Sequence, residues 1–466
     1  MRPLDKGLFI SKGLHATFLD YILNATLTTK GFYRRFSMKP VYLVMGKRTP
    51  QVKAGGELKD VPVPYLGSKL IENIFNQLDI PADQIDEVIV GNTGTPAKYP
   101  NIGRVIALEA GLDKKTSGYS VHRNCASGME ALSQAYLKIA SGRSDLIFAG
   151  GVESMSQMPL MYGKEMTDLF VLLMRAKTPQ QKLKALTNFR FPHLAPIVAI
   201  EQGLTDPFCG LNMGQTAEKL AREFGITRQM QDTFANESHA RAVAAQKEGF
   251  FNDQLVGVHY GHNVDKYVTE DVGPRANSNM ESLAKLKPFF ERKTGSVTVG
   301  NSCPITDGGS MWLFASEEAV KKYNLTPMAR MVDYHFHGLE PERMGLGPVL
   351  ATNGLLERTG MTLDQMDLVE LNEAFAAQVL ACQHVFKDKS AAAKWGIDKA
   401  HGEIPSEKLN VNGGAIALGH PVGSTGSRLV VTLAHELKRR KAKYGLATLC
   451  IGGGQGGACI IENLEV

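Results

Sequence analysis

Residues 83–92 read Asp-Gln-Ile-Asp-Glu-Val-Ile-Val-Gly-Asn, and residues 364–373 read Asp-Gln-Met-Asp-Leu-Val-Glu-Leu-Asn-Glu. Each stretch follows an amphipathic helix pattern, at about 66–78 and 348–358. Each predicts a short buried strand that ends in a polar loop. The chain therefore contains an internal duplication, which decides the fold.

The duplication continues downstream in both halves. Residues 126–140 have apolar side chains at helical spacing and lead to a strand pattern at 146–149. Residues 424–438 likewise predict a helix, and 445–450 predict the strand after it. Two copies of a strand–helix–strand unit imply two similar layered α/β domains, with a site between them near the strand ends.

A stretch richer in helix signals, with helices expected at 214–224 and 228–248, interrupts the repeat. We interpret it as an inserted loop domain that covers the cleft. The chain then divides into an N-terminal extension (1–37), the first part of an N-terminal domain (38–155), the inserted loop domain (156–304), the second part of the N-terminal domain (305–326) and a C-terminal domain (327–466).

The N-terminal extension carries Arg34-Arg35 and several hydroxyl residues, with only Asp5 and Asp20 acidic. This composition fits a mitochondrial-type presequence, which would place the protein in the mitochondrial matrix. The alternative is an upstream start codon with Met38 as the real beginning, and a bacterial cytoplasmic protein.

Composition and charge exclude several classes of function. The 466 residues are 43% hydrophobic and 21% charged, which is typical of a soluble globular enzyme. A net charge of +5 suits an anionic substrate but is too weak to indicate nucleic acid. There is no run of about 18 apolar residues, so no transmembrane helix is expected. None of the six cysteines forms a CxxC pair, so we expect no metal site.

Cys125 has the sequence context of a nucleophile. It lies in His-Arg-Asn-Cys-Ala-Ser-Gly, between a strand pattern at 119–121 and the helix predicted at 126–140. Free backbone N–H groups and the positive end of the helix dipole stabilise a thiolate there, so the sequence predicts a lowered pKa. The alternative is a small core residue, which is the usual role of a lone cysteine.

Three further residues lie in loops that suit chemistry. His420 lies in a Gly-rich loop, where its imidazole can take the proton of a neighbouring thiol, although a loop histidine can also be incidental. Cys450 ends a strand in Leu-Cys-Ile-Gly-Gly-Gly, whose glycines permit close approach of a ligand. Asn372 follows the repeated strand. It can polarise a carbonyl oxygen, directly or through water, or cap a helix.

Together these four motifs resemble the thiolase family over about residues 40–466. The resemblance implies an α/β fold of duplicated βαβαββ domains in a layered αβαβα arrangement with an inserted loop domain. It implies acyl transfer between a cysteine and coenzyme A, in which acyl-CoA and CoA are substrates and no cofactor or metal is needed. Cleaving a C–C bond between two carbonyls needs a thioester-forming nucleophile, a proton donor and two oxyanion holes.

The resemblance also implies a role for each residue. Cys125 corresponds to the nucleophile that holds the acyl group, and Cys450 to the second catalytic cysteine, an acid/base. His420 corresponds to the activator of Cys125 and a donor to one oxyanion hole, with Asn372 acting through water. The backbone N–H groups of Cys125 and Gly452 correspond to the second oxyanion hole.

Residues of the predicted insert are similar to the CoA-binding segments of thiolases. Arg275 matches a position near the adenine end of CoA, with Ser282 beside it. Cys303 stands where the family commonly has serine. Met213 follows Asn212, where short-chain acetoacetyl-CoA thiolases often have His, so the resemblance implies the degradative, broader-chain branch.

Residues 160–195 are basic with an apolar component. They resemble the insert of thiolase subunits in multienzyme β-oxidation complexes, which implies docking on a membrane surface or on a hydratase/dehydrogenase subunit. The alternative is a solvated basic helix that covers the active site. Those subunits usually have His at the position of Asn372, which is a departure. The family also implies a homodimer or homotetramer.

Three alternatives remain beside the degradative thiolase. A β-ketoacyl synthase would carry a second histidine instead of Cys450. A non-catalytic lipid carrier of the same fold would tolerate loss of the cysteines or of His420. Within the family, the alternative is a biosynthetic acetoacetyl-CoA thiolase, which condenses two acetyl-CoA molecules.

Overall fold

The duplicated segments form matching strands, β3 (Glu87–Gly91) and β12 (Leu368–Leu371), in a computed structural model of the protein. The structure describes residues 38–261 and 265–465, so both interpretations of the N-terminal extension concern residues outside the described part. Each strand pairs in parallel with the strand that closes its own unit. These partners are β5 (Leu146–Ser154) and β13 (Tyr444–Ile451).

The other strands of the sheet are β1 (Val41–Arg48), β2 (Val52–Lys53), β4 (Ser117–Val121), β10 (Thr306–Ser316), β11 (Ala329–Gly338) and β14 (Gln455–Asn463). The order is β12-β13-β14-β11-β1-β10-β5-β3-β4, with β2 paired to β10. At the centre β1 and β11, the first strands of the two halves, pair antiparallel, and Val41 lies opposite Met331. Outward from this pair the two halves repeat the same sequence of partners. Even the outermost strand has a counterpart, a parallel bridge between Val369 and Leu409.

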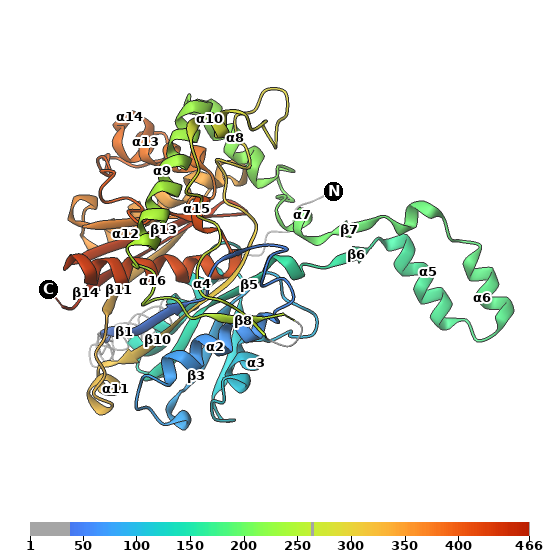
Figure 1. The fold of residues 1–466 in the computed structure, drawn as a ribbon, viewed down its shortest axis with the longest axis horizontal. Coiled ribbons are helices and arrows are strands. Elements are labelled where there is room, and N and C mark those ends of the chain that lie inside the picture. The colour runs from blue at the N-terminus through green and yellow to red at the C-terminus, as the bar shows by residue number, and fades with distance from the viewer. Residues whose placement is uncertain (1–37, 262–264, 466) are drawn as a thin grey trace, which may run out of the picture. The chain divides into compact units, whose positions relative to one another are not determined.

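Helices complete a five-layered arrangement (Figure 1). On the N-terminal half, α2 (Val63–Phe75) and α3 (Ile102–Glu109) cover the outer face. On the C-terminal half, α12 (Gly347–Thr359) covers the outer face. Between the halves lie α4 (Ser127–Ala140) and α16 (Val422–Arg440), which pack on each other. The predicted αβαβα fold is therefore confirmed.

The two central helices approach each other through glycine. A Cβ atom on Gly128 of α4 would lie 2.9 Å from the backbone N of Ser427, and one on Gly426 of α16 would lie 2.6 Å from the backbone N of Met129. Side chains larger than hydrogen would force the helices apart at both points. Since Cys125 precedes α4 and His420 precedes α16, this crossing brings the two predicted catalytic loops together.

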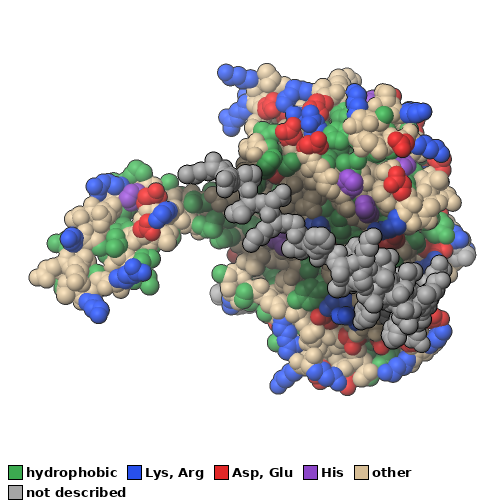
Figure 2. All heavy atoms as spheres, turned by 180° about the vertical axis from the view of Figure 1, so that it is seen from behind, with side chains coloured by type: hydrophobic (Ala, Val, Ile, Leu, Met, Phe, Trp, Pro, Cys, Tyr) green, Lys and Arg blue, Asp and Glu red, His purple; other side chains and the backbone are tan. Residues whose placement is uncertain are grey.

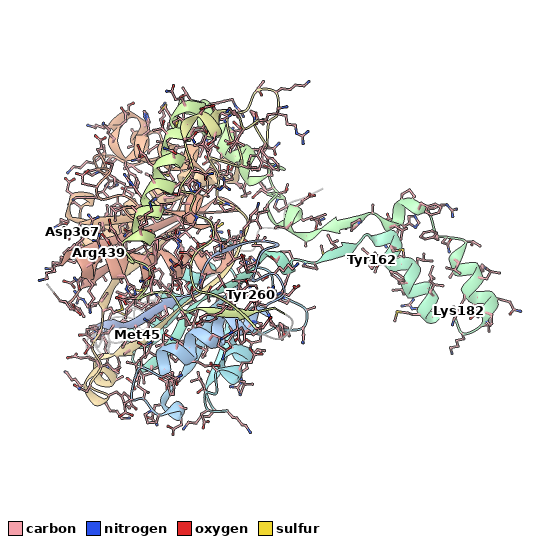
Figure 3. All side chains as sticks on the ribbon, in the orientation of Figure 1. Met45, Tyr162, Lys182, Tyr260, Asp367 and Arg439 are labelled. Carbon is pink, nitrogen blue, oxygen red and sulfur yellow. The ribbon has the colours of Figure 1, made fainter. Side chains whose placement is uncertain are left out.

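Residues 160–198 form an arm that projects from the layered body (Figure 1). Its elements are β6 (Leu160–Tyr162), α5 (Lys164–Arg175), α6 (Pro179–Leu186), η4 (Phe191–Leu194) and β7 (Pro196–Val198). The two strands pair antiparallel at its base, and α5 and α6 pack together. Tyr162 and Lys182 mark its near and far parts in Figure 3.

The remaining helices and strands lie in the predicted insert and around the C-terminal half. They are α7 (Ala199–Gly203), α8 (Met213–Glu223), α9 (Arg228–Lys247), β8 (Val258–Tyr260), β9 (Lys266–Val268), α10 (Met280–Ala284), α11 (Glu317–Lys322), α13 (Ala376–Lys387), α14 (Lys389–Ala393) and α15 (Ala415–Leu418), with short turns of helix η2 (Ala82–Gln84), η3 (Met155–Gln157), η5 (Pro341–Leu346) and η6 (Leu363–Gln365). In the described part of the chain no helix is long and apolar enough to cross a membrane.

Candidate active site

Cys125 occupies the tight turn between β4 and α4, directly before the helix. Its side chain is only partly exposed. Burial raises the pKa of the thiol, opposed by the backbone N–H groups of Gly452 and of Cys125 itself, and the carboxylate of Glu153 raises it further. The predicted lowering of this pKa is therefore wrong for the free protein. The helix N-terminus does not compensate for burial, so the thiol is neutral and needs a base.

His420 lies in the loop between α15 and α16, with 7% of its surface exposed. Its backbone N–H donates to Thr306 Oγ1 over 3.1 Å, and its ring Nδ1 lies 2.6 Å from Thr425 Oγ1. Burial lowers the pKa of the imidazole to about 3, and the cation of Arg428 contributes. The ring is therefore neutral at physiological pH and able to accept a proton.

The hydroxyl of Thr425 determines which ring nitrogen is the base. Thr425 Oγ1 lies 3.0 Å from the carbonyl oxygen of Pro421, which can only accept a hydrogen bond. A hydroxyl has one proton, so Thr425 donates to Pro421 and must accept from Nδ1–H of His420. Nε2 then carries the free lone pair, and among the described residues it has no hydrogen-bond partner.

Cys450 lies two residues before Gly452, where the glycine turn 452–454 begins, and is 1% exposed. Burial raises the pKa of its thiol well above the usual value, and the thiols of Cys125, Cys382 and Cys303 raise it further. The Cys450 thiol therefore lies near these three thiols and is protonated. A neutral thiol beside a second thiol can donate a proton, which is the property that an acid/base partner needs.

Asn372 supplies two unpaired polar atoms. Its side chain is fully buried, yet neither Oδ1 nor Nδ2 has a hydrogen-bond partner in the described residues. The alternative role as a helix cap is wrong, because α13 begins at Ala376 with Phe375 in the capping position. Buried polar groups are normally satisfied, so a water or a substrate oxygen is the expected partner of Asn372 and of His420 Nε2.

The segment that carries Cys303 runs between these groups. Ile305 forms a parallel β-bridge with His420. The N–H of Cys303 donates to the carbonyl of Ala374 over 3.1 Å. Burial raises the pKa of the Cys303 thiol to about 12, and the neighbouring Cys125 adds to this. Cys303 therefore lies near Cys125.

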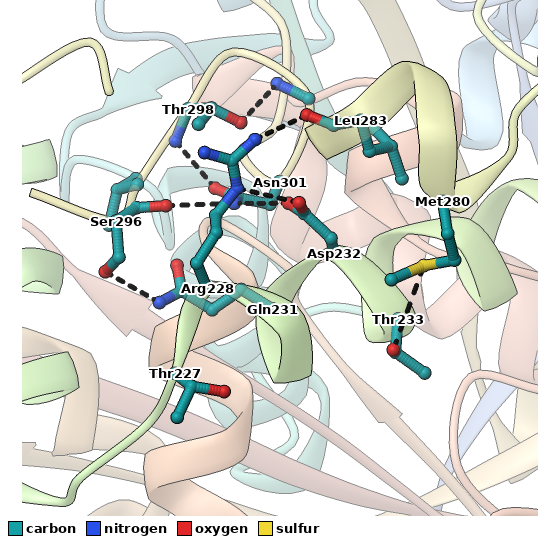
Figure 4. A network of polar contacts seen from close by, with 12 residues as sticks. Thr227, Arg228, Gln231, Asp232, Thr233, Met280, Leu283, Ser296, Thr298 and Asn301 are labelled. Carbon is teal, nitrogen blue, oxygen red and sulfur yellow. Dashed lines mark hydrogen bonds and ion pairs between the residues drawn. The ribbon is translucent and has the colours of Figure 1, made fainter. Parts of the chain in front are cut away.

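A polar network supports this segment from the side of the insert (Figure 4). Asn301 Nδ2 donates to Asp232 Oδ1 over 2.9 Å, and Arg228 Nε donates to the other oxygen of Asp232 over 2.7 Å. Arg228 also donates to the carbonyl of Leu283 in α10. The carbonyl of Asn301 accepts from Ala376 N–H at the start of α13. The network thus joins α9, α10 and the Cys303 segment.

The four residues predicted to bind CoA all lie between residues 213 and 303, in the predicted insert. Met213 begins α8, and its sulfur lies 3.3 Å from where a Cβ on Gly452 would be, so it lies against the glycine turn 452–454. Arg275 donates its backbone N–H to His239 Nδ1 over 3.3 Å. Ser282 lies in α10, where Asn279 caps its backbone N–H over 2.8 Å.

Two buried carboxylates hold the loops in place, and neither was predicted from the sequence. Glu373 accepts hydrogen bonds from Ser238, Asn410 and Ile416 at 2.6–3.1 Å, which fixes the loop before His420. Glu153, at the end of β5, accepts from Gly423 N–H over 2.9 Å and from backbone N–H groups of residues 93 and 94. The available signal was a carboxylate in the last residues of a buried strand or just after one, since a buried carboxylate needs hydrogen-bond donors.

Known protein families share both halves of the chain. The family model described as the N-terminal domain of thiolase matches residues 41–318, and the one described as the C-terminal domain matches residues 325–463. The chain belongs to the thiolase family. It is 38% identical to a "probable acetyl-CoA acyltransferase" of Staphylococcus aureus over 92% of this thiolase and 100% of the relative.

Solved structures of other thiolases are also similar to this chain. The acetyl-CoA acetyltransferase of Bacillus anthracis has a TM-score of 0.80 and 36% identity to this thiolase, covering 92% of it and 100% of the relative. Human mitochondrial 3-ketoacyl-CoA thiolase in complex with CoA has a TM-score of 0.78 and 34% identity, covering 92% and 98%. This thiolase is thus an acyltransferase of the acetyl-CoA acyltransferase type.

Proposed function

We propose that this thiolase cleaves 3-ketoacyl-CoA with CoA, giving acetyl-CoA and an acyl-CoA shortened by two carbons, as in fatty-acid β-oxidation. The observation that carries the proposal is the free Nε2 of a neutral His420 at the same centre as two protonated thiols. No metal or cofactor is needed for this chemistry. CoA and acyl-CoA are the substrates.

In the first half-reaction, His420 Nε2 takes the proton of the Cys125 thiol, and the sulfur attacks the 3-keto carbon. The oxygen that becomes negative is stabilised by the backbone N–H groups of Cys125 and Gly452. The bond between C2 and C3 then breaks, and the thiol of Cys450 gives its proton to C2 of the leaving acetyl-CoA. The negative charge on the thioester oxygen of acetyl-CoA is stabilised by His420 and by Asn372 through water.

In the second half-reaction, the thiolate of Cys450 takes the proton of an incoming CoA thiol. The CoA sulfur attacks the acyl group on Cys125, and the shortened acyl-CoA leaves as Cys125 recovers its proton from His420. The first product, acetyl-CoA, leaves before the second substrate, CoA, reacts, so ping-pong kinetics are expected.

Asn212 supports the degradative branch of the family. It caps α8, with Gln215 N–H donating to its Oδ1 over 2.9 Å, directly before Met213. The test is thiolysis of 3-ketoacyl-CoA of four to sixteen carbons, with Cys125→Ala as the control. Activity that rises with chain length supports the proposal. Activity confined to acetoacetyl-CoA favours the biosynthetic alternative, and equal activity in the control refutes both.

We further propose that the arm docks on an anionic membrane surface. Phe191 is 82% exposed, Met174 84% and Leu183 68%, which is unusual for large apolar side chains. Figure 2 shows basic and hydrophobic side chains interspersed on the arm. Basic side chains beside exposed apolar ones are the composition of interfacial helices. The basic residues are Lys164, Arg175, Lys177, Lys182, Lys184 and Arg190.

Co-sedimentation with vesicles tests this docking. The wild-type protein should bind vesicles that contain phosphatidylserine and should bind neutral phosphatidylcholine vesicles much less. A variant with Leu183→Ser and Phe191→Ser should lose binding while it keeps its thiolysis rate, because both side chains lie outside the site. Binding that survives these changes contradicts the proposal, and capture of the arm by a hydratase/dehydrogenase subunit instead of vesicles would replace it.

We also propose a homodimer, and β4 is the surface that supports it. The strand lies at the edge of the sheet, so one side of its backbone is open to pairing with a second copy. It leads directly to Cys125, so pairing there would also steady the nucleophile. Light scattering should give twice the mass of one chain, and a monomer at micromolar concentration contradicts the proposal.

A further inference from the structure

Asn124 joins the two catalytic loops across the site. Its Nδ2 donates to the carbonyl oxygen of Gly452 over 2.7 Å. The same nitrogen lies 3.8 Å from where a Cβ on Gly452 would be and 3.7 Å from one on Gly453. The side chain of Asn124, which directly precedes Cys125, therefore lies against the glycine turn 452–454.

The glycine turn needs such a contact to keep one conformation. Gly453 and Gly454 have φ values of 88° and 77°, which glycine adopts at little steric cost, and a run of glycines has the largest backbone entropy to lose. The far end of the turn is fixed by Leu339 N–H, which donates to the carbonyl of Gly454 over 2.8 Å. The near end, at Gly452, is held by Asn124.

The backbone of Asn124 also suits this role. Its φ of 45° lies in the left-handed region, which asparagine tolerates better than most residues. The turn does not depend on the amide, because Ser127 Oγ accepts from Arg123 N–H over 2.8 Å and donates to the Asn124 carbonyl over 2.7 Å. Loss of the Asn124 side chain should therefore release Gly452 and leave Cys125 in place.

We propose that Asn124 is a positioning residue that aims the backbone N–H of Gly452 at the oxygen of the acyl group on Cys125. This inference rests on the proposed Cys125 acyl-enzyme. The Gly452 N–H acts directly on the Cys125 thiol, where it opposes the rise in pKa caused by burial. Because the donor and the hydrogen-bonded carbonyl belong to the same glycine, a rotation of Gly452 displaces both.

Two variants at Asn124, which differ in their effect on the backbone, test the proposal. Asn124→Gly removes the amide and relieves the left-handed backbone, whereas Asn124→Asp keeps the shape and replaces the donor with an acceptor. We expect kcat for thiolysis to fall about tenfold or more in both variants, because an oxyanion donor contributes about 10²–10³ in kcat and is displaced, not removed. The KM for CoA should change less than about twofold. The matched control is Asn324→Gly, a left-handed asparagine (φ 49°) after α11.

A second readout does not depend on turnover. The pH midpoint for alkylation of Cys125 by iodoacetamide should move upward in both variants, since the thiolate loses the Gly452 N–H, and should stay unchanged in the control. Wild-type kcat and an unchanged alkylation midpoint in Asn124→Gly would overturn the proposal. If the wild-type protein shows no acyl transfer, the proposed function fails, and the alkylation midpoint still decides whether Asn124 positions Gly452.

Discussion

Replacing Thr425 with valine should remove the base without removing His420. Valine has the same branched shape as threonine, so α16 and its packing are expected to persist. The change deletes the acceptor that lies 2.6 Å from Nδ1 of His420. The buried ring then keeps an unpaired N–H, or it moves the proton to Nε2 and loses the lone pair that faces the substrate.

The size of the expected fall in kcat follows from the free-energy cost of leaving a buried N–H donor unpaired. Leaving such a group unsatisfied costs about 1–3 kcal/mol, which corresponds to about 5- to 150-fold fewer molecules with a free Nε2. We therefore expect kcat to fall about ten- to a hundredfold and KM for CoA to stay within about threefold. Stability should fall by a similar 1–3 kcal/mol, since the Pro421 carbonyl also loses its donor.

The assay is steady-state thiolysis of acetoacetyl-CoA by wild type, Thr425→Val and Thr425→Ser, together with thermal unfolding. Thr425→Ser keeps the hydroxyl and should stay within about threefold of wild type. Wild-type kcat in Thr425→Val would refute the assignment of Nδ1–H by the Thr425 hydroxyl. An equal loss in both variants would contradict an effect of the hydroxyl alone, because Thr425→Ser retains the hydroxyl.

Three further outcomes are expected. The pKa values of His420 and His435 are lowered by burial from 6.5 to about 3 and about 4. Only the unfolded chain binds these protons below about pH 6.5, so stability should fall from there to pH 4, by about 3 kcal/mol for His435, and His435→Gln should flatten the slope in chemical denaturation. Gly151→Ala should unfold at lower temperature and lose activity, because its Cβ would lie 2.0 Å from the carbonyl oxygen of Gly423. Glu373→Ala removes three buried hydrogen bonds, from Ser238, Asn410 and Ile416, and should destabilise the protein by about 3 kcal/mol or more in the same titrations.

The fold was predictable because it leaves local signals, and so do the three loops that carry the candidate catalytic residues. The repeat at 83–92 and 364–373 identified β3 and β12, and the loops of Cys125, His420 and Cys450 stand out by composition. In the structure these three residues lie at one centre, joined by the crossing of α4 and α16.

What the sequence could not predict depends on partners distant in the chain. The pKa of Cys125 is raised because burial exceeds the effect of the helix end, and burial is not visible in a motif. The bond from Asn124 to Gly452 joins residues 328 positions apart. The pairing of β1 with β11, which joins both halves in one sheet, likewise depends on the assembled fold.

The most direct test of the account is to locate the acyl group. The protein would be incubated with acetyl-CoA, quenched in acid and mapped by mass spectrometry, beside Cys125→Ala and Cys450→Ala. We predict an acetyl group on Cys125 in the wild type and in Cys450→Ala, with turnover lost in the latter, and none in Cys125→Ala. Acetyl on Cys450 or Cys303, or a Cys125→Ala protein that is still labelled, would contradict the account.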